Sequence, residues 1–282
     1  MRIVCAGHVN WDVTLRVDRL PVPDGEAVVQ SRREGGGGSA ANTACGLAAL
    51  DCEATLVGSV GNDELGERVQ ASLRAAGVTT AVRVVDDAET TTKYVLVDDD
   101  GEVALLGTDG ANEALEPTDV DASLLDGADG LHLTGQRPDT ATRLAALAAD
   151  RDITVSFDPG RRLADRDYGA VLERTDLLFV TDREAAAIDV AADVPARVTK
   201  HGNDGATLEC PTGRFTHGGY ALSGVDSTGA GDAFAAGFLA VWLGDGDPER
   251  ALSVGNACGA LAASIPGSSA PLSWDAIDEV VS

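Results

Sequence analysis

Lysine is nearly absent from this chain of 282 residues, where it occurs only as Lys93 and Lys200. The other basic residues are arginines, and 46 acidic residues against 21 basic ones give a formal net charge of -25. A charge of this sign repels nucleic acids and acidic membranes, so neither is an expected partner. An acid-rich, lysine-poor surface is typical of a protein that works in concentrated salt, because screening relieves the self-repulsion. We therefore expect a halophilic source.

Long apolar runs are missing as well. No run approaches the roughly 20 residues that a bilayer span requires, and the start MRIVCAGHVN lacks the basic region of a signal peptide, which predicts a cytoplasmic protein. The five cysteines are odd in number and show no CxxC spacing, so buried thiols are favoured over disulfides or a zinc site. Hydrophobic residues make up 44% of the chain, as in ordinary globular proteins, and we expect one domain over residues 1–282.

Short β-branched or apolar runs alternate with helical stretches along most of the chain. This rhythm predicts an α/β fold with a mostly parallel sheet covered by helices. The expected strands lie at 2–7, 54–60, 130–135, 153–157, 176–181 and 196–199. The expected helices lie at about 39–50, 63–76, 139–150, 183–188, 229–243 and 248–264, with a last one after Ser273.

Two segments, 12–34 and 82–107, break this rhythm. Both alternate polar and apolar positions and contain turn residues, the pattern of antiparallel strands that are wet on one face. We expect them to pair into a small β-sheet outside the main one, where it would act as a lid.

The stretch DSTGAGD at 226–232 carries the strongest chemical signal. It runs directly into the apolar helix pattern AFAAGFLAVWL, so Gly229, Ala230 and Gly231 lie where a loop becomes a helix. The first N–H groups of a helix lack intrahelical acceptors and can hold a phosphate. Asp232 would stand in the first turn, where it can take a proton from an attacking hydroxyl. The plainer alternative is an ordinary helix start with an acidic first turn.

A second glycine-rich loop, GGGGSAAN at 35–42, also leads into a helix. Its spacing fits GxGxxA, so an NAD-dependent oxidoreductase is the rival interpretation from a different class. That rival needs a buried strand before the glycines, whereas AVVQSRRE alternates and then becomes charged. We therefore interpret Gly37 and Gly38 as allowing a substrate close to the backbone, with Asn42 reaching its hydroxyls. A P-loop is excluded because neither lysine follows a glycine as GxxxxGK[ST] demands.

Together these motifs resemble the PfkB (ribokinase-like) family of carbohydrate and nucleoside kinases. DSTGAGD near the C-terminal end and GGxxxN near the N-terminal end carry the resemblance, which extends over nearly the whole chain. GHVNWDVTLRVDRLP, GTDGAN, SFDPGRR and VTKHGNDGA also look like family segments. The resemblance implies a three-layer α/β/α sandwich with a β-sheet lid, and ATP-dependent phosphorylation of a hydroxyl on a small sugar or nucleoside. It also implies ATP with Mg²⁺ as cofactors, an activating K⁺, and a homodimer formed through the lid.

The resemblance assigns roles by position. The residues implied to bind the substrate are Asp12, Gly37, Gly38, Asn42 and Gln136. Those implied to carry out the transfer are Asp232 as base and Gly229, Ala230 and Gly231 as anion hole. Those implied to contact the nucleotide are Lys200, Gly202, Thr228 and Asn256. Glu184 would act through water on Mg²⁺, and a monovalent cation would be held by Asp226 and Thr228.

The chain departs from the family at two positions. Thr181 replaces the asparagine of the metal-side NxxE motif, which weakens the metal assignment. Ser39 replaces the lysine of the ribokinase-type GGKGAN, which argues against ribokinase itself.

Several substrates stay open. A nucleoside would need an aromatic shelf, which Trp11 and Tyr94 could provide; 2-keto-3-deoxygluconate would need a cation, for which Arg137 and Lys93 are weak candidates. A phosphosugar would need several basic groups at the lid, and few are evident in the sequence. A sugar-binding module without catalysis is a further alternative, against which the intact Asp232 argues.

Overall fold

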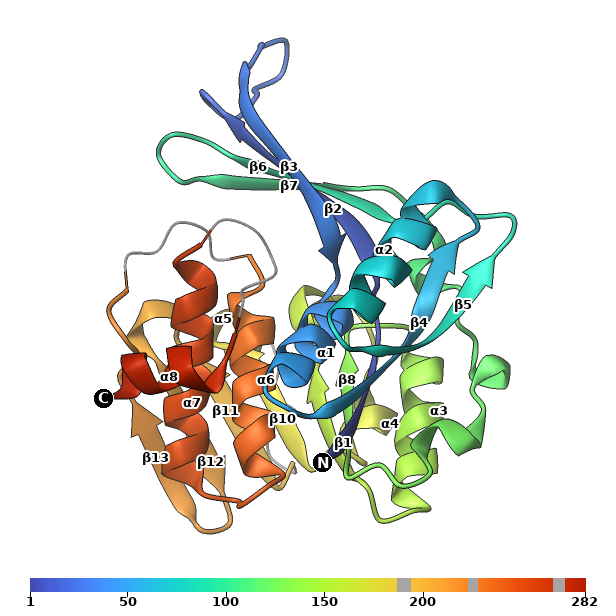
Figure 1. The fold of residues 1–282 in the computed structure, drawn as a ribbon, viewed down its shortest axis with the longest axis vertical. Coiled ribbons are helices and arrows are strands. Elements are labelled where there is room, and N and C mark those ends of the chain that lie inside the picture. The colour runs from blue at the N-terminus through green and yellow to red at the C-terminus, as the bar shows by residue number, and fades with distance from the viewer. Residues whose placement is uncertain (187–193, 223–227, 266–271) are drawn as a thin grey trace.

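The computed structural model describes residues 1–186, 194–222, 228–265 and 272–282. A nine-stranded sheet runs through its centre, flanked by helices, and a smaller sheet projects from it (Figure 1). In spatial order the strands of the large sheet are β13 (Gly213–His217), β12 (Ala206–Cys210), β11 (Ala196–Lys200), β10 (Leu177–Thr181), β9 (Thr154–Asp158), β8 (Gly130–Thr134), β1 (Arg2–Ala6), β4 (Glu53–Gly61) and β5 (Thr79–Val85).

The large sheet is parallel from β5 to β11, and the β12–β13 hairpin adds two antiparallel strands at one edge. Its inner strands are buried on both faces, which explains their continuous apolar runs. The carboxyl ends of parallel strands meet along one edge of a sheet, where α/β proteins bind their ligands. This edge carries Asp158 at the end of β9, Thr181 at the end of β10 and Lys200 at the end of β11.

Helices cover both faces of this sheet and enclose two apolar cores. One core contains buried side chains of five helices: α1 (Ser39–Ala49), α2 (Glu64–Ala75), α6 (Ala230–Trp242), α7 (Pro248–Ala263) and α8 (Trp274–Val281). The other contains those of α3 (Pro138–Ala149) and α4 (Gly169–Leu172). The short helix α5 (Asp182–Ala186) follows β10, and the 3-10 helices are η1 (Ala111–Glu113), η2 (Pro117–Asp119), η3 (Ala122–Leu125), η4 (Gly160–Asp165) and η5 (Gly202–Asp204). Within the described ranges, no helix is long and apolar enough to cross a membrane.

The small sheet is the expected lid. It consists of β3 (Val29–Gly37), β2 (Asn10–Val17), β6 (Thr92–Val97) and β7 (Val103–Gly107), and it extends away from the body in Figure 1. One expected boundary is wrong: residues 82–85 belong to β5, which pairs with β4 in the large sheet. The polar and apolar alternation of this segment arises because β5 is an edge strand with one face exposed to solvent. Lid strands show the same alternation, so the pattern alone could not assign the segment to the correct sheet.

Helices α6 and α7 pack closely because glycines replace side chains at their contact. A Cβ added at Gly237 of α6 would lie 2.5 Å from Sγ of Cys258 and 3.0 Å from the carbonyl oxygen of Val254, both on α7. Phe234 and Phe238 stack on the same helix and bring its first turns against the sheet. This packing fixes the position of the amino end of α6.

We predict that Gly237→Ala lowers the free energy of unfolding by about 1–3 kcal/mol, because the added methyl overpacks the α6–α7 contact. Denaturant unfolding at constant KCl measures this. In the Cys258→Ala background the same substitution should cost less, since the sulfur is removed. An equal or greater loss in that background would show that the contact does not limit the helix spacing.

Candidate active site

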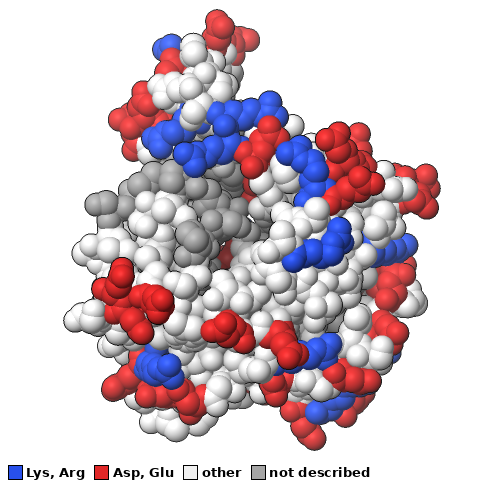
Figure 2. All heavy atoms as spheres, viewed as in Figure 1, with Lys and Arg blue, Asp and Glu red and all other residues white. Residues whose placement is uncertain are grey.

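A cavity of about 790 Å³ lies where the lid meets the body. Its walls come from β2 and β3 of the lid, from α1 and α2, and from the start of α6. The residues that line it include Asp12, Thr14, Arg33, Gly37, Asn42 and Gly229. Figure 2 shows this face of the molecule hollowed below the lid. The glycine-rich loop and Gly229, nearly two hundred residues apart, therefore line one cavity.

The amino end of α6 separates this cavity from a second one. Gly229, the N-cap residue with φ 77°, lines the large cavity, whereas Ala230 and Gly231 line a smaller cavity of about 140 Å³. The left-handed backbone at Gly229 suits glycine and turns the chain into the helix. The first N–H groups of a helix point toward its amino end, so here they face the junction of the two cavities.

Asp232 lies in the first turn of α6 and is hydrogen-bonded to a residue of α1. Its Oδ2 accepts a bond from Nδ2 of Asn42 at 2.8 Å. Burial raises the pKa of Asp232 to about 6, although the bond from Asn42 and the charges of Lys200 and Lys93 act to lower it. A carboxylate with this pKa is ionised near neutral pH and binds a proton more readily than an ordinary aspartate.

Lys200 supplies a positive charge beside Asp232. Its Nζ donates to Oδ2 of Asp158 at 2.5 Å, and a Cβ built at Gly231 would lie 3.4 Å from the same Nζ. Burial acts to lower the pKa of Lys200, but the carboxylates of Asp158, Asp232 and Glu184 together outweigh it and the pKa is raised. The lysine is therefore charged, and the ion pair fixes its ammonium group next to the amino end of α6.

On the lid side, Asp12 occupies β2 at the wall of the large cavity. Its Oδ1 accepts a bond from Nδ2 of Asn10 at 2.8 Å, and burial raises its pKa. A Cβ at Gly37 would lie 2.0 Å from Oδ2 of Asp12, and a Cβ at Gly38, with φ 102°, would lie 2.3 Å from the carbonyl oxygen of His8. Neither glycine can therefore be replaced without moving the carboxylate or the chain.

Three of the residues predicted to contact a nucleotide line the smaller cavity: Lys200, Gly202 and Asn256. Nδ2 of Asn256 donates to the carbonyl oxygen of Leu252 at 2.7 Å, which orients the amide on α7. Thr228 directly precedes Gly229 in the chain and interacts with another group of the protein. Asp226, expected to join Thr228 at a cation site, lies outside the described residues.

Two other predicted site residues have structural partners. Gln136 is 4% exposed, donates from Nε2 to the carbonyl oxygen of Ala6 at 3.3 Å, and is absent from the described walls of both cavities. Oε2 of Glu184 accepts the N–H of Thr181 at 2.8 Å, and Oγ1 of Thr181 accepts the N–H of Glu184 at 3.3 Å, so the pair caps α5. The described residues contain no group of three or more His, Cys, Asp or Glu side chains able to hold a metal ion.

Two cationic residues of the lid, Arg33 and Lys93, were not predicted to bind a substrate phosphate. Arg33 of β3 lines the large cavity, and Lys93 of β6 pairs in register with Asp12. Lys93 and Asp12 share one face of the lid, which only the pairing of β2 with β6 shows, because alternation within a segment does not set the register between strands. The aromatic shelf expected for a nucleoside is not on that face. Trp11 precedes Asp12 and therefore points to the other face, where Arg68 covers it at 4.3 Å.

The position of the glycine-rich loop in the fold contradicts its interpretation as a dinucleotide-binding loop. The strand before the glycines is β3, the exposed edge strand of the lid, and not a buried strand of the parallel sheet. A Rossmann loop requires the latter.

Comparison with known proteins agrees with this geometry. The model of the pfkB family carbohydrate kinases matches residues 1–275. The chain is 54% identical to the ATP-dependent ribose-1-phosphate kinase of the halophilic archaeon Halopiger xanaduensis, over 98% of this chain and 97% of that one. It is 26% identical to a nucleoside kinase of Methanocaldococcus jannaschii, over 99% and 96%. The structure of Arabidopsis thaliana ribokinase complexed with ribose and ATP superimposes with a TM-score of 0.87 at 22% identity, covering 99% and 98% of the two chains.

We predict that Asn42→Leu raises the pKa of Asp232 above its value of about 6, by an amount of order one pH unit, because a hydrogen bond to the ionised form is lost. Carboxyl-carbon NMR titration of labelled aspartates measures it. Asn62→Leu is the matched control, since Asn62 makes the same kind of bond to the distant Asp86 at 2.9 Å. A pKa of Asp232 that is the same in both variants would contradict the prediction.

Proposed function

The chain belongs to the pfkB family of carbohydrate kinases, and we propose that this ATP-dependent sugar kinase phosphorylates ribose 1-phosphate. The observation that supports this substrate is the 54% identity to a ribose-1-phosphate kinase, which extends over nearly the full length of both chains. The acceptor would be the primary hydroxyl of the sugar, because it is the hydroxyl farthest from the existing phosphate. It can reach Asp232 while the phosphate stays near the lid.

In the mechanism that we propose, Asp232 is the general base. The sugar occupies the large cavity, with its hydroxyls held by Asp12 and Asn42 and its ring close to the backbone of Gly37 and Gly38. Asp232 takes the proton of the primary hydroxyl as its oxygen bonds to the γ-phosphorus of ATP. The bond from that phosphorus to the bridging oxygen breaks, and ADP leaves from the other side.

The amino end of α6 would stabilise the charge of the transferred group. Gly229 lines the large cavity and Ala230 and Gly231 line the smaller one, so their N–H groups would lie along the path of the phosphoryl group. Lys200 adds a fixed positive charge on the nucleotide side and is held there by Asp158. Gly202 and Asn256 would contact the rest of the nucleotide.

We also propose that Mg²⁺ accompanies ATP and that Glu184 orders one of its waters. The cap to Thr181 uses Oε2 of Glu184, which leaves Oε1 to accept a bond from a water, and the charge of Glu184 reaches Lys200. When bound, the ion would neutralise charge on the phosphates. Thr228 and Asp226 remain our candidates for a K⁺ site.

The lid supports two further parts of the proposal. Its closure over the sugar would exclude water from the transfer step. Its exposed apolar side chains, among them Val103, Leu105 and Leu106, favour a homodimer formed through the lid, which light scattering in concentrated KCl would contradict by giving a monomer mass. We place the enzyme in the cytoplasm because it uses ATP and its five cysteines are all free thiols.

A coupled ADP-release assay in concentrated KCl tests the substrate. We expect kcat/KM for ribose 1-phosphate to exceed that for ribose, nucleosides and 2-keto-3-deoxygluconate by at least about tenfold, since only ribose 1-phosphate would use the whole cavity. A higher kcat/KM for a nucleoside or a free sugar would overturn the proposed substrate and leave the kinase class intact.

We predict that Asp232→Asn lowers kcat by about a hundredfold or more, because the amide cannot accept the proton. The side chain keeps nearly the same size, so ATP binding should persist, which the rise in melting temperature on adding ATP measures. Near-normal turnover in this variant would rule out Asp232 as the base.

A further inference from the structure

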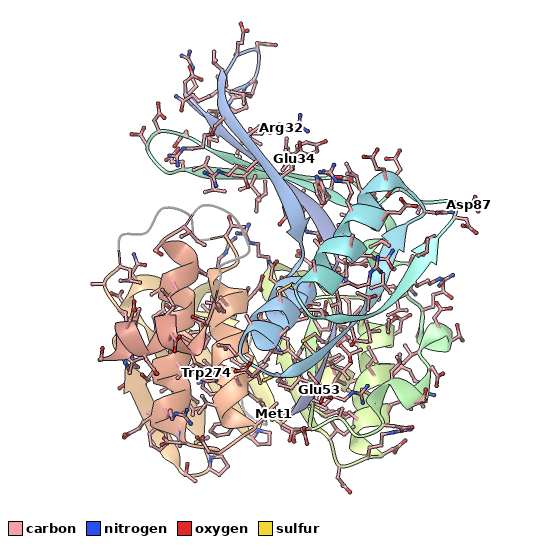
Figure 3. The ribbon with its side chains drawn as sticks, in the orientation of Figure 1. Met1, Arg32, Glu34, Glu53, Asp87 and Trp274 are labelled. Carbon is pink, nitrogen blue, oxygen red and sulfur yellow. The ribbon has the colours of Figure 1, made fainter. Side chains whose placement is uncertain are left out.

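Two cations of the lid, Arg33 and Lys93, form no ion pair with any described residue, a state that they share with some other described arginines such as Arg16 and Arg68. Arg32 pairs with Glu34 at 2.9 Å, and Arg166, Arg250 and Lys200 are likewise held by carboxylates. Both Arg32 and Glu34 are labelled on the lid in Figure 3. Across the described part of the chain, Arg33 and Lys93 form no ion pair within 4.0 Å, although acidic residues outnumber basic ones by more than two to one.

The strand register puts both cations on the face of the lid that carries Asp12. Lys93 lies beside Asp12 in the β2–β6 pair, and Arg33 lies opposite Thr14 in the β2–β3 pair. Residues paired in this way point to the same face, and Asp12 and Thr14 are two residues apart on β2, so all four share it. Asp12, Thr14 and Arg33 line the large cavity. Arg32, the next residue along β3, points the other way.

The field of Lys93 extends into the site. Its charge acts to lower the pKa of both Asp12 and Asp232, so the ammonium group lies close enough to interact with both carboxylates. Figure 2 shows Lys and Arg side chains gathered where the lid overhangs the hollow, while acidic side chains are scattered over the rest of this face.

A free sugar gives no reason to keep unpaired cations at its site, since it carries no charge. The nucleotide residues Lys200, Gly202 and Asn256 line the other cavity, beyond the end of α6. An anionic substrate, in contrast, must approach a protein of net charge -25, and a local positive charge offsets that repulsion. Guanidinium and ammonium groups on one face of the lid form the kind of donor set that binds a phosphomonoester.

We propose that Arg33 and Lys93 bind the phosphate that the sugar already carries, and thereby set the preference of this kinase for a phosphorylated pentose over a free one. The proposal rests on the proposed function and names the residues that recognise its substrate. With the phosphate at the lid and the primary hydroxyl directed to Asp232, the sugar would extend from the lid side of the large cavity toward the amino end of α6, where Gly229 lines that cavity.

The test compares Arg33→Gln and Lys93→Met with Arg32→Gln as the matched control. Each of the first two variants should lower kcat/KM for ribose 1-phosphate by about 10- to 100-fold, the loss expected for a hydrogen bond between charged groups. The KM for ATP and the kcat/KM for free ribose should not change, and Arg33→Lys should recover part of the loss. All assays use one KCl concentration, because salt screens the interaction.

Calorimetry can measure the binding of ribose 1-phosphate in the absence of nucleotide. This measurement tests the phosphate site independently of the proposed function. If the wild type binds ribose 1-phosphate without phosphorylating it, the proposed function is wrong, and weaker binding by Arg33→Gln and Lys93→Met still supports the phosphate site. If both variants bind it as tightly as Arg32→Gln does, the phosphate site is overturned even where turnover is observed. A raised KM for ATP with unchanged binding of the sugar phosphate would overturn it too.

Discussion

The candidate site depends on the free energy of holding one carboxylate, that of Asp232, at the partly buried amino end of α6. Removing a carboxylate from water is costly, and here the bond from Asn42 and the charge of Lys200 only partly offset this cost. The pKa of Asp232 therefore settles at about 6. A group in this state is ionised near neutral pH yet ready to accept a proton, which suits a general base better than a fully hydrated aspartate.

The rest of the fold places partners around this group. Close packing of α6 on α7 fixes the end of the helix, and the carboxyl edge of the parallel sheet supplies Asp158 and Lys200. The lid brings Asp12 to the opposite wall. Two cavities meet at the same helix end, so an acceptor and a donor can approach one phosphoryl group from opposite sides. This arrangement fits the family match and the class of enzyme that the motifs predicted, a PfkB-type sugar kinase with a ribokinase-like fold.

Much of this could be predicted from the sequence because the signals are local. Apolar runs predicted six strands of the large sheet, and the apolar pattern after DSTGAGD predicted α6. The acid-rich composition agrees with the 54% identical halophilic relative. The edge strands of the large sheet were harder to predict. Residues 82–85 of β5 were assigned to the lid, and the β12–β13 hairpin was not predicted. Strands that are exposed to solvent on one face have the same sequence pattern in either sheet.

Within the site, the residues that depend on tertiary contacts could not be predicted. Glycines and an aspartate in a motif identify a helix end. The Asp158–Lys200 ion pair, in contrast, joins β9 and β11, and the sequence does not give the order of these strands in the sheet. The cap between Glu184 and Thr181 differs, because the sequence T-x-x-E at 181–184 is itself the local pattern of a capping box. Arg33 and Lys93 belong to segments far apart in the chain, and only the register of β2 with β3 and β6 brings them to one face of the lid.

A crystal structure of the enzyme with ribose 1-phosphate and a non-hydrolysable ATP analogue tests the central claim most directly. The account predicts that the primary hydroxyl of the sugar lies within hydrogen-bond distance of Asp232 and faces the γ-phosphate across the amino end of α6. A sugar bound with a different hydroxyl toward the nucleotide, or an Asp232 carboxylate out of contact with it, would contradict the account.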